Sequence, residues 1–172
     1  MSTTRYRIID SPIGPLTLTG DGEALTGLTM QDQSHAPTER RDLSPDERAF
    51  PDVVDQLAAY FAGELTEFDV DLRMEGTPFQ RRVWSELLEI PYGETMSYGE
   101  LARRIGQPTA FRAVGLANGR NPVAIIVPCH RVIGSTGALV GYGGGLDRKR
   151  RLLELERNQA EPRLGGLTLI LG

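Results

Sequence analysis

The stretch NPVAIIVPCHRVIG, residues 121–134, constrains the fold more than any other part of the chain. Its central residues 123–127 are all apolar, and Pro122 and Pro128 bound them on both sides. A short apolar run between breakers is typical of a buried strand. Cys129, the single cysteine of the 172 residues, comes directly after it. The pattern therefore predicts a buried strand that ends by placing one thiol where the chain leaves the core.

This lone cysteine has two interpretations. Free Cys is among the most frequently buried residue types and can be an inert part of a core. A nucleophilic thiol, whose pKa is ordinarily about 8.5, needs a base or a positive field. His130 is the obvious base, but adjacent side chains of an extended chain point to opposite sides, so a direct contact needs a turn and otherwise a bridging water. The cysteine alone favours the inert interpretation, whereas with Pro128 before it and His130 and Arg131 after it both interpretations stay open.

The scarcity of metal-binding side chains excludes several classes of protein. One cysteine allows no internal disulfide and no cysteine-cluster zinc site, and the only histidines are His35 and His130. We therefore expect neither a metal nor a cofactor. No apolar stretch is long enough to span a bilayer, and residues 1–9 lack the pattern of a signal peptide. A cytoplasmic protein without a membrane partner is the expectation.

Charge is distributed unevenly along the chain. Residues 1–75 carry 6 Lys and Arg against 15 Asp and Glu, whereas residues 76–172 carry 13 against 8. A basic excess in one half favours contact with an anion, and nucleic acid is one candidate. Two solvated surfaces that happen to differ are the simpler explanation, so charge alone does not decide.

Residues 1–75 predict a small α/β domain. Segments 5–10 and 16–19 are expected to form a β-hairpin, and residues 25–30 a third strand. Residues 31–51 are polar and indicate a surface loop, and residues 67–72 alternate again as in a strand. A helix over residues 52–61 would end at Gly63 and bury a stripe of Val53, Leu57, Tyr60 and Phe61.

Residues 76–160 predict a mainly helical domain. Thr77, Pro78 and Gln80 have the order of an N-cap, a first-turn proline and a capping box. The helix that they begin would bury Phe79, Val83, Trp84, Leu87 and Leu88. Ser97 is expected to start a second helix, residues 97–106, and a third would cover residues 109–118. The last two are typical of a helix-turn-helix, although an ordinary corner between two helices is more common.

The last of these helices has a surface that suits a nucleic-acid groove. Arg112 lies near its start, and its predicted exposed face carries only the small residues Ala113, Gly115 and Ala117. A smooth helix with one long cation can approach DNA closely, but small residues also favour close helix packing.

Beyond Cys129, a glycine-rich loop and a helix complete the candidate site. The loop at Tyr142, Gly143 and Gly144 lacks the spacing of a phosphate-binding motif and predicts a flexible loop that can approach a ligand. Asp147 would cap a helix with Leu152, Leu153 and Glu156 facing inward. Glu156 is the best candidate for an acid that orients His130, and Glu154 is the second. The basic run at residues 148–151 is typical of a solvated face.

Taken together, SYGELA, RAVGLANGRNPVAIIVPCHRVIG and GYGGGLDRKRRLLELE resemble the O6-alkylguanine-DNA alkyltransferase family, also called methylated-DNA–protein-cysteine methyltransferases. SPIGPLTLTG and YFAGEL extend the resemblance into the first half. It implies an α+β fold with a ribonuclease-H-like N-terminal domain (residues 1–75), a helical DNA-binding domain with a helix-turn-helix (residues 76–160), and a tail, residues 161–172, without a known role. That tail could be an extra strand or a flexible end.

The resemblance also implies catalytic roles. Cys129 corresponds to the acceptor of the alkyl group from guanine O6, His130 to its base acting through a water, and Glu156 to the acid that polarises His130. Asn121 corresponds to the asparagine that braces the turn before the acceptor. Each molecule would react once, without a cofactor, because nothing in the chain could remove the alkyl group.

For the substrate, the resemblance implies double-stranded DNA carrying O6-alkylguanine, bound in its minor groove by a monomer that can assemble cooperatively on DNA. Arg112 corresponds to the finger that fills the gap of the extruded base, and Tyr98 to the tyrosine that helps to rotate the nucleotide. The implied DNA contacts are Thr109, Arg112, Ala113, Gly115, Ala117 and Asn118. The implied pocket residues are Tyr98, Val132, Tyr142, Gly143 and Gly144. Many relatives carry Ser at the position of Gly143, so a side-chain contact to O6 would be lost there.

Two other functions remain as alternatives. A non-catalytic binder of alkylguanine lesions would share the fold, but such proteins replace the acceptor cysteine that this chain keeps. A cysteine hydrolase would need a distant histidine, and His35 lies in a polar loop far from any motif.

Overall fold

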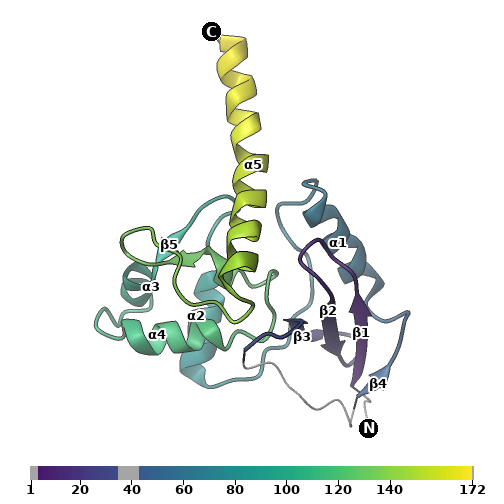
Figure 1. The fold of residues 1–172 in the computed structure, drawn as a ribbon. Coiled ribbons are helices and arrows are strands. Elements are labelled where there is room, and N and C mark those ends of the chain that lie inside the picture. Colours follow the sequence, from purple (N-terminus) through teal and green to yellow (C-terminus); the bar gives the residue numbers. More distant parts are fainter. Residues whose placement is uncertain (1–3, 35–42, 172) are drawn as a thin grey trace.

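The computed structural model describes residues 4–34 and 43–171, with side chains described as far as residue 160. Among the described residues, a sheet and one helix form the first half, and four helices form most of the second (Figure 1). The sheet contains β1 (Arg5–Ile9), β2 (Leu16–Gly20), β3 (Leu25–Met30) and β4 (Ser44–Pro45), in the order β3-β2-β1-β4. β1, β2 and β3 are antiparallel neighbours, so the predicted hairpin and third strand are confirmed. β4 pairs in parallel with β1, within the segment expected to be a loop.

α1 (Pro51–Phe61) confirms the predicted helix of the first half. Val53, Leu57 and Tyr60 are buried, whereas Phe61 is only half-buried. The left-handed backbone of Gly63 follows the helix end, with φ at 77°. Glycine adopts this conformation without the steric penalty that a Cβ would add.

The strand predicted for residues 67–72 is wrong. This segment makes one bridge, between Leu72 and Leu25, and continues without a ladder. At Asp69, the side chain of Gln56 takes the place of a neighbouring strand, because its amide donates to the Asp69 carbonyl and accepts from the Asp69 N–H. A backbone whose donor and acceptor are already paired has nothing to offer a neighbouring strand.

α2 (Pro78–Leu87) starts with the predicted capping box of Thr77 and Gln80. Val83, Trp84 and Leu87 are buried as predicted, and Phe79 is half-buried. Leu88 lies at the C-cap and is 46% exposed, so its assignment to the buried stripe is wrong.

α3 (Tyr98–Arg104) and α4 (Phe111–Gly119) follow each other and are in contact. The Ser97 hydroxyl accepts from the Glu100 N–H, which confirms the predicted N-cap. α4 begins two residues later than predicted, because residues 107–110 first form a turn closed by the Ala110 N–H and the Gln107 carbonyl.

The strand predicted for residues 123–127 is also wrong, although all five residues are buried. They fold into consecutive turns, with the Val127 N–H bonded to the Val123 carbonyl at 3.0 Å. Ile125 has a left-handed backbone with φ at 72°. β3 stabilises this compact loop, because the Leu28 N–H donates to the Pro122 carbonyl and the Leu28 carbonyl accepts from the Ala124 N–H.

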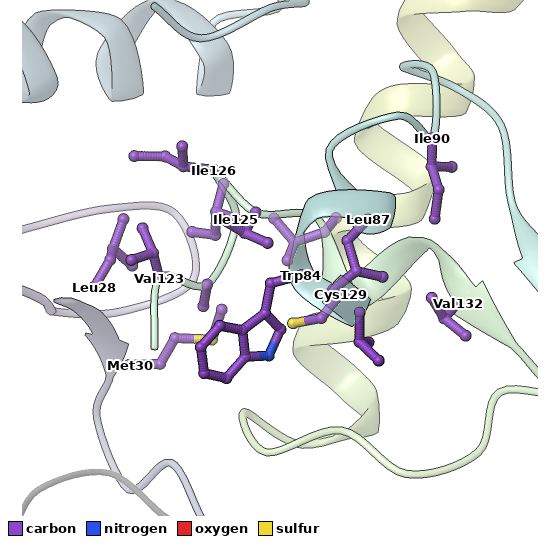
Figure 2. Close-up of a cluster of buried hydrophobic side chains, with 14 of the residues drawn as sticks. Leu28, Met30, Trp84, Leu87, Ile90, Val123, Ile125, Ile126, Cys129 and Val132 are labelled. Carbon is purple, nitrogen blue, oxygen red and sulfur yellow. The ribbon is translucent and has the colours of Figure 1, made fainter. Parts of the chain in front are cut away.

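Both halves contribute to one hydrophobic core around these turns. Figure 2 shows side chains of the sheet, of α2 and of residues 123–132 gathered together, Cys129 among them. The cluster includes Leu28, Met30, Trp84, Leu87, Ile90, Val123, Ile125, Ile126, Cys129 and Val132. The thiol is therefore positioned by packing from the sheet as well as from the helices.

α5 (Leu146–Leu171) begins between the two halves and extends away from them (Figure 1). The helix continues through residue 171, so the extra strand considered for the tail is wrong. Before it, β6 (Val132–Ile133) pairs in parallel with β5 (Met96–Ser97). Within the described residues, no helix combines the length and the low polarity needed to cross a membrane.

Candidate active site

Cys129 and His130 lie on a short 3-10 turn, η1 (Cys129–Arg131), directly after the buried turns. Cys129 is 6% exposed and His130 is fully buried. The chain therefore makes the turn that neighbouring side chains would need in order to act together. His130 Nδ1 nevertheless has no hydrogen-bond partner among the described residues, so the imidazole and the thiol are not directly bonded.

The other nitrogen of His130 binds Glu156. His130 Nε2 lies 2.7 Å from Glu156 Oε2, and both side chains are buried. The Arg131 guanidinium donates to both carboxylate oxygens, at 2.8 Å through Nε and 3.0 Å through Nη2. The Tyr60 hydroxyl of α1 adds a donor at 2.6 Å. Glu156 is thus the acid that the sequence favoured, whereas Glu154 is exposed.

These contacts determine the charge state of the pair. Burial raises the pKa of Glu156, but His130 and Arg131 outweigh it and hold that pKa at about 2. Burial also lowers the pKa of His130. An ionised carboxylate only accepts hydrogen bonds, so Nε2 carries the proton and Nδ1 of the neutral ring keeps its lone pair. His130 therefore has a base at Nδ1 and an anion behind Nε2.

The thiol itself is kept protonated by its surroundings. Burial raises the pKa of Cys129, and the Asn121 side chain, the charge of Lys149 and Tyr142 oppose this rise. A thiol with a raised pKa is a weak nucleophile until a base removes its proton. The thiol can thus stay protonated and unreactive until a base within the site removes its proton.

Asn121 occupies the bracing position that the resemblance implied. Its Nδ2 donates to the Val127 carbonyl at 2.7 Å, and its Oδ1 accepts from the Val123 N–H at 3.0 Å. The two bonds span the whole buried turn. They also explain why residues 123–127 need no strand partner for these backbone groups.

Lys149 is a buried cation that the sequence interpretation missed. Its Nζ donates to the carbonyls of Val132, at 2.6 Å, and Val140, at 3.1 Å. Burial lowers its pKa to about 8, and the thiolate form of Cys129 would oppose that change. The basic run at residues 148–151 is thus not simply a solvated face. The spacing of residues 149, 152, 153 and 156 places Lys149 on the same helical face as Glu156, and this signal could have identified it.

A cavity of about 280 Å³ opens beside Cys129. The predicted pocket residues Tyr98, Tyr142, Gly143 and Gly144 line it together with Cys129. Val132 does not line it, so that prediction is wrong: its side chain is fully buried in the core. Gln33 and Ser34, from the first half of the chain, are further lining residues that no motif in the sequence indicated.

The predicted DNA-contact residues divide into two groups. Thr109, Arg112 and Ala113 are exposed, and Gly115 is half-buried beside Tyr98. Ala117 is buried, so its assignment to an exposed face is wrong, and Asn118, an implied DNA contact, is buried as well. The Ala117 carbonyl accepts from the Trp84 indole, and the Asn118 amide donates to the Cys129 carbonyl. That side of α4 packs inward, although Asn118 still borders the cavity.

Arg131 and Tyr60 were also missed. Arg131 follows His130 directly, but adjacency alone does not show that its guanidinium turns back to Glu156. Tyr60 was assigned to the core stripe of α1, and nothing in the periodicity shows that its hydroxyl reaches the second half. His35 lies outside the described residues. Within the described chain, no group of three or more His, Cys, Asp or Glu side chains could hold a metal ion.

Two family models match most of the chain. The model described as 6-O-methylguanine DNA methyltransferase, ribonuclease-like domain, matches residues 4–74. The one described as 6-O-methylguanine DNA methyltransferase, DNA binding domain, matches residues 78–158. The chain belongs to this family. The resemblance seen in the sequence motifs is confirmed, and the sheet-containing N-terminal half corresponds to the ribonuclease-like domain.

Relatives within the 6-O-methylguanine DNA methyltransferase family are similar over nearly their whole length. A Mycobacterium tuberculosis protein named methylated-DNA–protein-cysteine methyltransferase is 66% identical over 155 residues, 90% of this chain and 93% of the relative. A Mycobacterium leprae protein of the same name is 61% identical over 163 residues, 95% and 96% of the two chains. A crystal structure of M. tuberculosis OGT in complex with DNA has a TM-score of 0.86 and 66% identity, covering 90% of this chain and 94% of that one.

Proposed function

We propose that this protein repairs DNA by direct reversal, transferring the alkyl group of O6-alkylguanine to Cys129. The observation that carries the proposal is the thiol at a cavity, followed by a histidine whose far nitrogen is bound to a buried, ionised glutamate. The family membership and the names of the relatives support the same reaction. A DNA complex of the M. tuberculosis relative supports DNA as the partner.

We infer from the buried position of the thiol that the damaged base leaves the duplex before it reacts. Cys129 is 6% exposed, so it cannot reach an alkyl group within stacked base pairs. Extruding a nucleotide costs a few kcal/mol, and less for a poorly paired lesion. We infer that α3 and α4 act as a helix-turn-helix against the minor groove, and that exposed Arg112 fills the gap. Tyr98, which lines the cavity and donates to the Val140 carbonyl at 3.2 Å, would guide the nucleotide inward.

The transfer itself needs a thiolate for one step only. His130 Nδ1 accepts the thiol proton through a water molecule, and Glu156 stabilises the resulting imidazolium. The sulfur pair then bonds to the alkyl carbon as the bond from carbon to O6 breaks, and that bond's electron pair stays on guanine. Donors at the cavity stabilise this developing charge, and guanine finally takes up a proton.

The product thioether explains why we expect a single reaction per molecule. Restoring the thiol would require a second nucleophile that breaks the bond between the sulfur and the alkyl carbon, and we expect the chain to supply none. The protein would thus be consumed stoichiometrically, as a monomer that needs no cofactor.

The test is the number of repaired lesions per protein molecule. When the protein is limiting, we expect each molecule to convert at most one O6-methylguanine in a duplex, and Cys129→Ser to convert none. Binding without conversion by the wild type would indicate a lesion binder instead. Continued turnover, or hydrolysis of an ester substrate, would indicate a hydrolase.

A further inference from the structure

Met30, the last residue of β3, and residues 31–34 after it form a wall of the cavity that belongs to the N-terminal domain. Gln33 and Ser34 line the cavity beside the glycine-rich loop. The Ser34 N–H donates to the Gly143 carbonyl at 2.8 Å, which links the wall to the loop. The N-terminal domain thus contributes residues to the reaction chamber itself.

The wall occupies the space that side chains of the loop would need. A Cβ added to Gly143 would lie 3.2 Å from the Ser34 carbonyl oxygen and 3.3 Å from Gln33 Cγ. A Cβ on Gly144 would collide with the Met30 sulfur. The side chain that projects beside Gly143 is therefore that of Gln33.

The orientation of the Gln33 amide follows from one hydrogen bond. The Met30 N–H donates to Gln33 Oε1 at 2.9 Å, so the oxygen faces the backbone and Nε2 faces away from it. Nε2 lies 3.7 Å from the Cβ position of Gly143. It has no acceptor among the residues that the structure describes, whereas the amides of Asn118 and Asn121, also at the cavity, donate to backbone carbonyls.

We propose that Gln33 is a further catalytic residue, whose Nε2 donates a hydrogen bond to O6 of the extruded guanine. This inference rests on the function proposed above and specifies where the leaving charge is stabilised. As the bond from the alkyl carbon to O6 breaks, its electron pair stays on the guanine ring system. A donor already held in place strengthens its bond to O6 as that charge develops, and so lowers the barrier.

Two substitutions distinguish the role of Gln33 as a hydrogen-bond donor from its role as part of the cavity wall. Gln33→Glu keeps an oxygen for the Met30 N–H but replaces the donor by an acceptor, and Gln33→Leu removes the donor without adding charge. Gln31→Glu is the matched control, because it adds the same charge to the same segment outside the cavity. Thermal unfolding of each variant verifies that the full chain is folded.

The measurement is the single-turnover rate constant on a duplex containing O6-methylguanine. In enclosed sites, removing one such donor lowers the catalytic rate constant by a factor of about 10²–10³. Since Gln33 is half-buried, we expect a loss of at least about tenfold for both Gln33 variants and less than about twofold for Gln31→Glu. Rates equal to that of the control would overturn the role of Gln33. A wild type that transfers no methyl group would instead refute the function itself.

A second comparison distinguishes stabilisation of charge from simple shape. Free O6-benzylguanine and an analogue with an electron-withdrawing substituent on the purine ring differ in how much charge O6 must carry. We expect Gln33→Leu to slow the unsubstituted base several times more than the analogue. Equal slowing of both would show that Gln33 only shapes the cavity, and would refute donation to O6.

Discussion

Replacing Glu156 by Gln removes the carboxylate that Arg131 and His130 share in the interior. The pKa of Glu156 falls from 4.5 to about 2 in the folded protein. At about 1.4 kcal/mol per pKa unit, this corresponds to roughly 3 kcal/mol of folding free energy at neutral pH. Loss of one partner of a buried ion pair typically costs about 3–5 kcal/mol. We therefore expect a loss of this size and a melting temperature lower by about 10 °C.

The pH dependence of this loss has a defined sign. A carboxyl whose folded pKa is lowered stabilises the protein above its unfolded pKa, and that contribution disappears as the pH falls from about 4.5 toward 2. The stability gap between wild type and Glu156→Gln should therefore be constant above about pH 5 and shrink below pH 4.5.

Urea unfolding across this pH range measures the gap, with Glu154→Gln as the matched control. Glu154 lies on the same helix but is exposed. In the same preparations, Glu156→Gln should transfer the alkyl group more slowly while binding the duplex as tightly as the control. The reasoning is refuted if both variants are equally stable at pH 7, or if the gap does not narrow in acid. An unchanged transfer rate would remove Glu156 from the relay.

Three further substitutions test the remaining parts of the site. Arg112→Ala should impair repair of duplex DNA but largely retain the reaction with free O6-benzylguanine; equal losses in the two rate assays would contradict its role in the duplex. Tyr60→Phe removes a donor that shares the charge of Glu156, so the pKa of His130 should rise and the acid limb of the rate–pH profile should move to higher pH. An unmoved limb would show that Tyr60 is only structural. Asn121→Ala deletes both bonds across the buried turn and should cost about 2 kcal/mol in urea unfolding. It should also raise the pKa of Cys129, measured by thiol alkylation against pH, and an unchanged pKa would contradict that link.

The N-terminal domain is more closely involved in the site than its lack of a catalytic motif indicated. β3 stabilises the buried turn through Leu28, α1 places the Tyr60 hydroxyl against Glu156, and Gln33 borders the cavity. These contacts join residues far apart in the sequence. A C-terminal domain expressed alone would lose all three.

Local patterns predicted those parts of the fold whose causes are local. The capping box at Thr77, the N-cap at Ser97 and the inward face of Glu156 each depend on residues three or four positions apart. Backbone and side-chain preferences at such spacings are readable from the sequence alone.

The sequence-based predictions were wrong or incomplete where a contact with a distant residue, or an unusual backbone conformation, determines the structure. An apolar run predicts burial but not shape, and at residues 123–127 the Asn121 side chain and the left-handed Ile125 produce turns instead of a strand. Lys149 appeared to belong to a solvated run, because its partners are carbonyls of a separate loop. Gln33 has no motif of its own and becomes significant only through its position beside Gly143.

The most direct test of the central claim is the intact mass of the protein after incubation with a duplex carrying O6-methylguanine, followed by peptide mapping. Our account predicts a gain of one methyl group in place of one hydrogen, at most once per molecule, located on Cys129 and absent in Cys129→Ser. An unchanged mass with the duplex still bound, or a methyl group on another residue, would contradict it.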